Sequence, residues 1–268
     1  MNTSKTFRSL NIEKIIGYTL FAFGITAIVI SIICNSQISA FTGLGLTFWG
    51  VILTYIKKEN IVNEPLLTSS VVSPLEIIDQ IIQEMKYTAK AVYLPPKYFR
   101  NPETCKAYIP KYGVEILPTP EQIQKQENKL FINNTEGLLI QPPGAALVKL
   151  FESTLKTSFN KTDLIYVEQN LPKLFIEELE IAENMEIQIK NEIIYLKIES
   201  SIYKNLIKQV STLAAVYNSL GCPLSSAIAC VLAKASGKLL VIESQQISED
   251  GAEITILFRF LKQEPPEP

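Results

Sequence analysis

The chain has 268 residues, of which 47% are hydrophobic and 19% are charged, with a net charge of −2 and no histidine. This composition excludes a disordered chain, a disulfide-stapled secreted mini-protein and a basic nucleic-acid binder, so no nucleic-acid partner is expected. It also excludes catalytic triads and HExxH zinc sites that need histidine. The residues indicate where the protein is located more clearly than what it does.

The first feature along the chain is a long stretch without charge. Residues 15–56 contain no Asp, Glu, Lys or Arg. Residues 15–34 are apolar and, at about 1.5 Å per residue, would span the roughly 30 Å of a hydrocarbon core. A polar break at 35–37 is followed by a second apolar run at 39–56. Since a bare backbone turn is not stable in lipid, the two runs predict an antiparallel transmembrane hairpin.

Basic residues flank this hairpin on both sides, and its connecting loop carries no charge. They are Lys5, Arg8, Lys14, Lys57 and Lys58. The positive-inside rule therefore predicts a multi-pass cell-membrane protein with both termini in the cytoplasm, residues 1–14 included. Neither span contains an ionisable residue, which argues against transport by the hairpin alone and favours an anchor in the lipid bilayer.

Two alternatives remain for this stretch. Lys5–Ile33 could be a cleaved signal peptide, although its apolar run is longer than usual and lacks an A-x-A site. The hairpin could instead be a buried soluble core, but an uncharged run of this length argues against that. The small residues Gly17, Gly24, Gly43 and Gly45 would allow close helix packing.

A linker at 57–73 is expected to lead into a soluble domain at 74–262. Ser73-Pro74-Leu75-Glu76 has the pattern of a capping box with proline at the first helical position, which predicts a helix over 74–87. Short strands are expected at 91–94, 106–109, 129–132 and 136–141, with a short helix after Thr119 and further helices over 145–155 and 161–182.

The clearest hairpin of the domain is predicted from alternating residues at 185–190 and 193–199. Helices follow over 201–220 and 223–236, with Gly237 as the C′ residue. Two strands, 239–243 and 253–261, close the domain, and 263–268 is a flexible tail. The fold class is therefore α+β, with antiparallel hairpins, in one domain or in two lobes (74–158 and 159–262).

The most distinctive string for chemistry runs from Gly221 through Cys222-Pro223 to Ser225-Ser226. A thiol and two hydroxyls at a helix N-terminus meet free N–H groups, an environment that lowers a cysteine pKa and holds anions. Gly221, Cys222, Ser225 and Ser226 are therefore the candidate ligand-binding residues. The alternative is structural: glycine turns the chain, proline starts the helix, and the small residues pack closely.

The other sequence patterns give weaker evidence for a functional site. The acidic run from Glu177 to Glu183 follows the expected solvent face of a helix. Cys222 and Cys230 are about 12 Å apart along a helix, beyond disulfide reach, and Cys34 and Cys105 are distant in sequence. The sequence has no C-x-x-C motif and no glycine-rich phosphate loop, so no metal site, no cofactor and no catalytic residue is predicted.

Four strings of the domain also occur together in a known family. They are Tyr93-Leu94-Pro95-Pro96, Glu136-Gly137-Leu138-Leu139 with Pro142-Pro143-Gly144, Leu171-Pro172-Lys173-Leu174 with Leu179-Glu180-Ile181-Ala182, and Gly221-Cys222-Pro223 through Cys230 to Lys234 and Gly237-Lys238. In these strings the chain resembles an uncharacterised family of archaeal membrane proteins with two N-terminal membrane helices and a cytoplasmic domain. The resemblance implies this architecture and an archaeal source, and no catalytic residues.

Three functions are compatible with these patterns. The leading hypothesis is a non-enzymatic cytoplasmic module that is held at the membrane and binds a protein or a small ligand. The second is an enzyme or anion-binding sensor centred on Cys222, Ser225 and Ser226. The third is an accessory subunit of a larger membrane complex, and the partner in either binding role could be another protein or a second copy of the chain.

Overall fold

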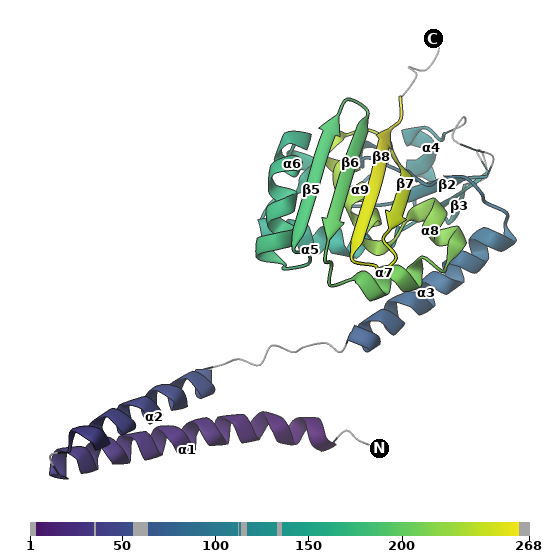
Figure 1. The fold of residues 1–268 in the computed structure, drawn as a ribbon. Helices are drawn as coiled ribbons and strands as arrows, with labels where there is room; N and C mark the ends of the chain where they lie inside the picture. The colour runs from purple at the N-terminus through teal and green to yellow at the C-terminus, as the bar shows by residue number, and fades with distance from the viewer. Residues whose placement is uncertain are drawn as a thin grey trace. The chain divides into compact units, whose positions relative to one another are not determined.

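The structure is a computed structural model that describes residues 4–34, 36–55, 64–111, 113, 117–132 and 136–262. It divides into two compact units, residues 1–63 and 64–268 (Figure 1). The predicted tail at 263–268 and the first part of the predicted linker, residues 57–63, lie outside the described residues. Each unit is described by itself below.

The first unit is a hairpin of two long helices, α1 (Ser4–Cys34) and α2 (Gln37–Tyr55). The helices approach closely because small residues recur every seven positions: Gly17, Gly24 and Ser31 on α1, and Gly43 and Gly50 on α2, are buried. A Cβ atom built on Gly24 would lie 2.5 Å from the Thr47 backbone nitrogen.

Gly45 does not take part in this packing. A Cβ atom built on it would have no heavy atom within 4 Å. Three of the four glycines that the sequence singled out therefore lie in the helix contact, and Gly50 belongs to it as well. The outward side chains stay exposed and apolar, for example Phe41, Ile38 and Ile32.

The second unit begins with α3 (Glu64–Glu84), which starts ten residues before the predicted helix and has Pro74 in its interior. The prediction of a linker through residue 73 and of a helix start at Pro74 is therefore wrong. Thr68, Leu75 and Ile82 are buried at helical spacing, so one continuous face packs on the domain. Pro74 lies on the solvent side, where its missing N–H can be tolerated.

The domain contains one eight-stranded sheet in which every pairing is antiparallel, with the order β3-β4-β2-β1-β7-β8-β6-β5. The strands are β1 (Val92–Tyr93), β2 (Ala107–Pro110), β3 (Phe131–Ile132), β4 (Gly137–Ile140), β5 (Asn184–Lys190), β6 (Ile193–Glu199), β7 (Leu240–Ile247) and β8 (Glu253–Phe260). The predicted hairpin is confirmed as β5 and β6.

The sheet also decides whether the domain has two lobes. β1, from the first half, pairs with β7, from the second. One sheet therefore crosses the suggested boundary near residue 158, and residues 64–268 form a single compact unit.

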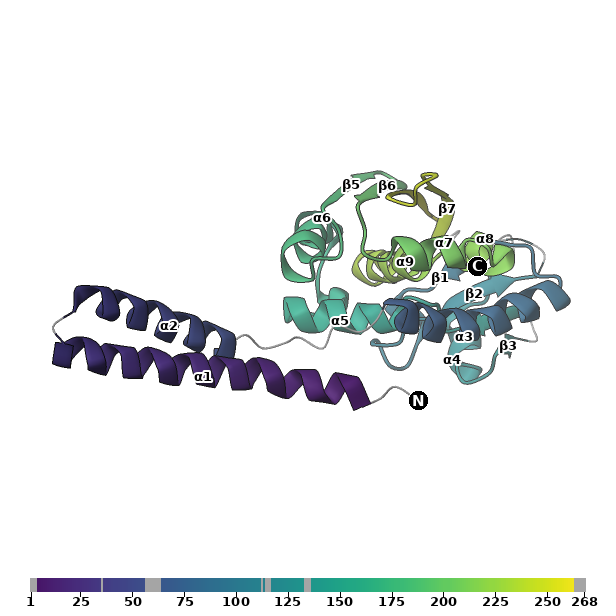
Figure 2. The same cartoon turned by 60° about the horizontal axis from the view of Figure 1, so that its bottom comes forward.

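One helix, α9 (Pro223–Ser236), lies at the centre of the domain. Besides α3, the other helices that the structure describes here are α4 (Pro120–Lys125), α5 (Ala145–Leu155), α6 (Leu164–Lys173), α7 (Lys204–Val210) and α8 (Ala214–Leu220), with short turns η1 (Pro96–Tyr98), η2 (Phe159–Lys161) and η3 (Leu174–Glu178). α9 packs against α5, α6, β7 and β1. Figure 2 shows β5, β6 and β7 arching over one side of α9 while α5, β1 and β2 lie on the other.

The position of α9 explains its composition. The helix is buried from Pro223 through Lys234, so it needs apolar and small residues on every side. For this reason Ala214–Ser236 is, among the described residues, one of three stretches long and apolar enough to cross a membrane, together with Ile16–Cys34 and Gln37–Thr54. It is 83% buried inside the domain, whereas the two N-terminal stretches are 17% and 11% buried.

Three predicted elements differ in detail. The helix expected over 161–182 is observed as α6 followed by the π-helical turn η3, which ends at Glu178. The helix expected over 201–220 is divided into α7 and α8. The Ser211 and Thr212 hydroxyls bond to the carbonyl oxygens of Lys208 and Gln209, and such local bonds compete with the helical pattern. The strand expected to end at Glu243 continues to Ile247 past a bulge after Ile242.

Candidate functional site

The predicted Gly-Cys-Pro turn forms the start of the central helix α9. Gly221 has φ of +76°, and a Cβ atom there would lie 2.4 Å from Ser225 Oγ, so only glycine fits. Cys222 is the N-cap residue, and its sulfur accepts a hydrogen bond of 3.4 Å from the Ser225 N–H. Gly237 ends the helix with φ of +66°, as predicted.

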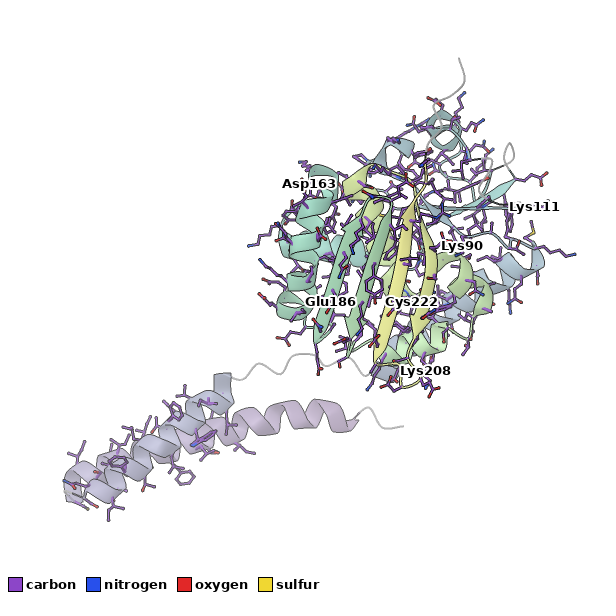
Figure 3. All side chains as sticks on the ribbon, turned by 45° about the horizontal axis from the view of Figure 1, so that its top comes forward. Lys90, Lys111, Asp163, Glu186, Lys208 and Cys222 are labelled. Carbon is purple, nitrogen blue, oxygen red and sulfur yellow. The ribbon has the colours of Figure 1, made fainter. Side chains whose placement is uncertain are left out.

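The side chains of this turn are engaged inside the protein. Ser225 Oγ lies 2.9 Å from Gln245 Oε1 and donates a hydrogen bond to it, and Gln245 Nε2 donates to the Tyr217 carbonyl. Ser226 Oγ accepts a hydrogen bond of 3.1 Å from the Gly144 N–H. Gly221, Cys222, Ser225 and Ser226 are all buried, which favours the structural alternative for this motif. Figure 3 shows Cys222 behind the strands of the sheet.

Burial also decides the acidity of the Cys222 thiol. Desolvation raises its pKa above the ordinary value, and hydrogen bonds from Ser225 and from nearby backbone N–H groups offset this only in part. The expectation that the helix N-terminus lowers the pKa of this cysteine is therefore wrong. The cause is that the thiol lies in the core, where its charged form loses hydration.

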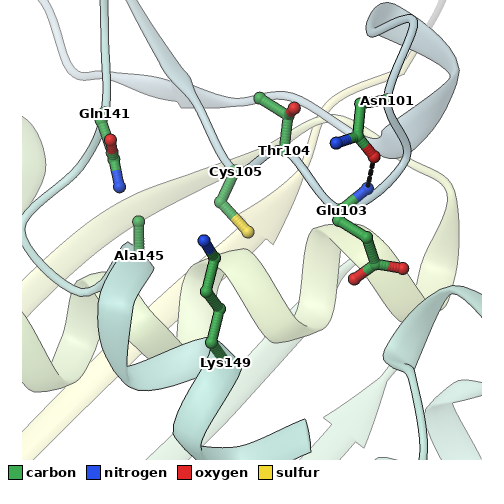
Figure 4. A pocket seen from close by; sticks show the side chains of 7 residues that line it. All are labelled: Asn101, Glu103, Thr104, Cys105, Gln141, Ala145 and Lys149. Carbon is green, nitrogen blue, oxygen red and sulfur yellow. Dashed lines mark hydrogen bonds between the residues drawn. The ribbon is translucent and has the colours of Figure 1, made fainter.

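A solvent-accessible cavity lies elsewhere, between the 101–105 segment that follows η1 and the first turns of α5 (Figure 4). Its volume is about 170 Å³. Its lining consists of polar side chains, one thiol and one methyl group: Asn101, Glu103, Thr104, Cys105, Gln141, Ala145 and Lys149. The Lys149 ammonium group and the Cys105 sulfur point toward one another across it (Figure 4).

The predicted motif positions one wall of this cavity without lining it. The hydrogen bond from Gly144 to Ser226 holds the start of α5 against α9. A Cβ atom on Gly144 would lie 2.1 Å from the Ala227 backbone nitrogen, so the two helices meet at backbone distance. Ser226 therefore acts on the cavity through the placement of α5.

A buried ion pair lies behind the cavity. Lys234, whose side chain is 2% exposed, is 2.8 Å from Glu152 and 3.4 Å from Glu103. Burial lowers the pKa of this lysine, but the hydrogen bond with Glu152 and the surrounding negative charges outweigh that effect and raise the pKa overall. Glu152 also accepts a hydrogen bond of 2.9 Å from the Phe159 N–H.

Two cysteines share the electrostatic surroundings of this ion pair. The interaction with Cys230 lowers the pKa of Cys105 most, burial opposes this, and the positive charge of Lys234 lowers the pKa further. Burial raises the pKa of Cys230 well above its ordinary value, and the interaction with Cys105 raises it further. One thiol of the pair therefore ionises more readily than the other.

Sequence reasoning missed this arrangement because Cys105 and Cys230 are far apart along the chain. The part that could have been found is the spacing of Cys230 and Lys234, which are four residues apart and so share one helix face. The sequence gives no sign that the segment before β2 reaches that face.

Two further predictions from the sequence concern the acidic run and metal binding. Glu177, Glu178, Glu180 and Glu183 are exposed as predicted, but Glu180 and Glu183 follow the end of η3 and do not lie on a helix. Within the described residues, no cluster of three or more His, Cys, Asp or Glu side chains could hold a metal ion.

Comparison with known proteins gives one match. The family model described as Domain of unknown function (DUF7982) matches residues 11–260 of this chain, which includes most of the helical hairpin and the whole sheet. Neither the comparison with curated proteins nor that with solved structures gave a match.

Proposed function

The chain belongs to the family of the domain of unknown function DUF7982, and we propose that it is a membrane-anchored, non-enzymatic module whose α+β domain binds a small polar ligand with an acidic group. The observation that carries the proposal is the cavity beside α5. Within the described part of the chain, the Lys149, Thr104 and Gln141 side chains that line it have no hydrogen-bond or ion-pair partner.

The proposed ligand follows from the charge and donors of the cavity. Lys149 supplies a positive charge, and the Gln141 amide and Thr104 hydroxyl supply further hydrogen-bond donors. The carboxylate at the cavity, Glu103, lies 3.4 Å from Lys234, which offsets part of its charge because Lys234 also pairs with Glu152. A ligand with a carboxylate or phosphate group would use these donors best.

The non-enzymatic role is supported by the groups available for acid–base chemistry. The chain has no histidine, so a general base in the cavity would have to be a carboxylate, a thiolate or a lysine. Glu103 is engaged in the ion pair, and Lys149 lies on the exposed surface of α5. This set suits binding of an anion better than proton transfer.

The proposed anchor consists of α1 and α2, which contain two of the three stretches in the described part of the chain that are long and apolar enough to cross a membrane. Most of their exposed side chains are apolar, as lipid contact requires. The basic residues at both ends of the hairpin favour cytoplasmic termini, which would place the cavity on the cytoplasmic side.

Native mass spectrometry of the full-length protein, extracted gently from its own membranes, tests the proposal. We expect a small bound mass on the wild type that is lost from Lys149→Ala. The matched control is Lys208→Ala, because Lys208 is an exposed lysine on α7, outside the cavity (Figure 3). This variant should keep the bound mass.

Two results would contradict the proposal. A bound mass that Lys149→Ala retains would place the ligand elsewhere. A stoichiometric protein mass without a small molecule would favour the accessory-subunit alternative, and a multiple of the chain mass would favour a homo-oligomer in its place.

A further inference from the structure

The carboxylate of Glu103, which lines the cavity, is only partly neutralised. Its side chain is 52% exposed, and one of its oxygens lies 3.4 Å from the Lys234 ammonium group. Lys234 lies closer to Glu152, at 2.8 Å, and that carboxylate is only 11% exposed. One positive charge therefore faces two negative charges, and both distance and burial favour its pairing with Glu152. A negative charge remains at Glu103.

The other hydrogen bonds of this carboxylate are long. Its Oε1 atom accepts a hydrogen bond of 3.3 Å from the Ser158 hydroxyl and one of 3.5 Å from the Asn160 amide. Ser158 has one proton to donate and lies closer to Glu152, at 3.1 Å. Since an ionised carboxylate can accept about four hydrogen bonds, Glu103 keeps the capacity to bind a donor that enters the cavity.

The backbone that carries Glu103 is held in a defined turn. The Asn101 Oδ1 atom accepts a hydrogen bond of 3.0 Å from the Glu103 N–H (Figure 4), and the Asn101 carbonyl accepts one from the Thr104 N–H. The Asn160 amide donates a hydrogen bond of 2.9 Å to the Pro102 carbonyl. The position of the carboxylate is therefore set before a ligand arrives, which lowers the entropy cost of binding.

The opposite wall of the cavity carries the opposite charge. Gln141 and Lys149 come from one side in Figure 4, at the start of α5 and just before it, whereas Asn101 and Glu103 come from the other. Lys149 is exposed and, among the residues that the structure describes, has no ion-pair partner. The cavity therefore has a positive wall at α5 and a negative wall at the 101–105 segment.

We infer that the ligand of this cavity is a zwitterion, a small α-amino acid whose carboxylate binds Lys149 and Gln141 and whose ammonium group binds Glu103. The inference rests on the function proposed above, since it takes the acidic group of that ligand to lie at Lys149. It adds a second charged group to the ligand and makes Glu103 the residue that selects for it.

The size of the cavity and its charges favour this class of ligand. The volume of about 170 Å³ is smaller than the roughly 300–1,000 Å³ of pockets for drug-sized molecules. One lysine matches the single charge of a carboxylate, whereas a phosphate monoester carries about −1.5 to −2 at pH 7. A simple carboxylic acid would bring a second negative charge toward Glu103, and an ammonium group beside the carboxylate offsets that repulsion.

Isothermal titration calorimetry of the full-length, dialysed protein in detergent tests the inference. The probes are glycine, L-alanine and L-serine, each compared with the acid that lacks its amino group: acetate, propionate and 3-hydroxypropionate. We expect at least one amino acid to bind at least about tenfold more tightly than its matching acid, because its ammonium group adds a charge-assisted hydrogen bond to Glu103. Ethylamine, which lacks the carboxylate of L-alanine, should bind more weakly than L-alanine.

Variants assign the two charges to their residues. Glu103→Gln removes the negative charge with little change in shape, so it should weaken binding of that amino acid at least about tenfold and should not weaken binding of the matching acid. Lys149→Ala should weaken both. Glu186→Gln is the matched control, because Glu186 is an exposed carboxylate on β5, outside the cavity (Figure 3). It should bind both probes as the wild type does.

The results separate this inference from the function on which it rests. If the bound mass in native mass spectrometry is lost from Lys149→Ala, but the amino acids bind no more tightly than their matching acids, the proposed function stands and the zwitterion is wrong. Failure of all three amino acids to bind contradicts the inference in the same way. A bound mass that Lys149→Ala retains overturns both. The comparison of probes on the wild type decides even if Glu103→Gln fails to fold.

Discussion

At the scale of single residues, Lys234 is the side chain whose environment is most unusual. It is a lysine buried in the central helix, and its charge is balanced by Glu152 at 2.8 Å and by Glu103 at 3.4 Å. Burial of one charge is tolerated here because its partner is buried beside it. Removal of one partner would leave the other carboxylate or ammonium group without compensation.

We therefore expect Lys234→Met to lower the free energy of unfolding by about 3 kcal/mol, because the Glu152 carboxylate would remain unpaired in a largely buried position. Urea denaturation followed by circular dichroism measures this change. The control is the double variant Lys234→Met/Glu152→Gln, which leaves no unpaired charge and should recover part of the loss. A single variant as stable as the wild type would show that the pair is not buried.

Cys222 gives a second prediction, which concerns how the stability of the protein depends on pH. Its folded-state pKa is raised above the ordinary value of about 9, so at higher pH the unfolded chain loses a proton that the folded chain keeps. The contribution of the Cys222 thiol to the free energy of unfolding is therefore constant below about pH 9 and decreases as the pH rises above it. Serine in its place would keep the N-cap but would not titrate.

We expect Cys222→Ser to unfold with nearly wild-type free energy at pH 7. Between pH 7 and pH 10 the wild type should lose more of its free energy of unfolding than the variant. Urea denaturation of the reduced proteins at the two pH values measures the difference. Parallel losses in both proteins would mean that this thiol ionises in the folded state.

At the scale of elements, α3 shows how a local sequence signal can be overridden by packing. Ser73-Pro74-Leu75-Glu76 has the residues of a helix start, yet the helix begins at Glu64. The apolar face at Val71, Val72 and Leu75 packs on the core, and this burial favours continuation through the proline. Helix stability in proteins depends more on such packing than on local propensity.

A helix that begins at Glu64 and a helix that begins at Pro74 predict opposite effects of Pro74→Ala. In the interior of a helix, alanine restores a backbone donor and removes a steric clash, so we expect the free energy of unfolding to rise by about 2 kcal/mol. At the first position of a helix, the same change would be neutral or unfavourable. Pro120→Ala is the matched control because Pro120 begins α4, and it should change stability little. Thermal unfolding of both variants gives the comparison.

At the scale of the whole molecule, the sequence predicted most elements because their signals are local. The short helix after Thr119, the β5–β6 hairpin and the start and end of α9 depend on neighbouring residues. The strand order and the cavity depend on contacts between distant residues, such as the pairing of Val92 with Val241, and no spacing along the chain encodes those.

The candidate site illustrates the same division. The Gly-Cys-Pro turn was visible because glycine, proline and an N-cap residue are consecutive. Its burial was not visible, because the sheet that covers it comes from residues far away in sequence. The ion pair of Glu103 with Lys234 beside the cavity needs the complete fold, since the two residues are 131 positions apart in the sequence.

The orientation of the hairpin gives the last prediction, and a native cysteine reports on it. Cys34 is exposed at the end of α1, at the loop that the basic flanking residues would place outside the cytoplasm. Cys105 belongs to the domain that would lie inside. In intact cells, a membrane-impermeant maleimide should therefore label the wild type and should not label Cys34→Ser. After permeabilisation Cys105 should react in both proteins. Labelling of Cys34 only after permeabilisation would reverse the orientation and would place the cavity outside the cell.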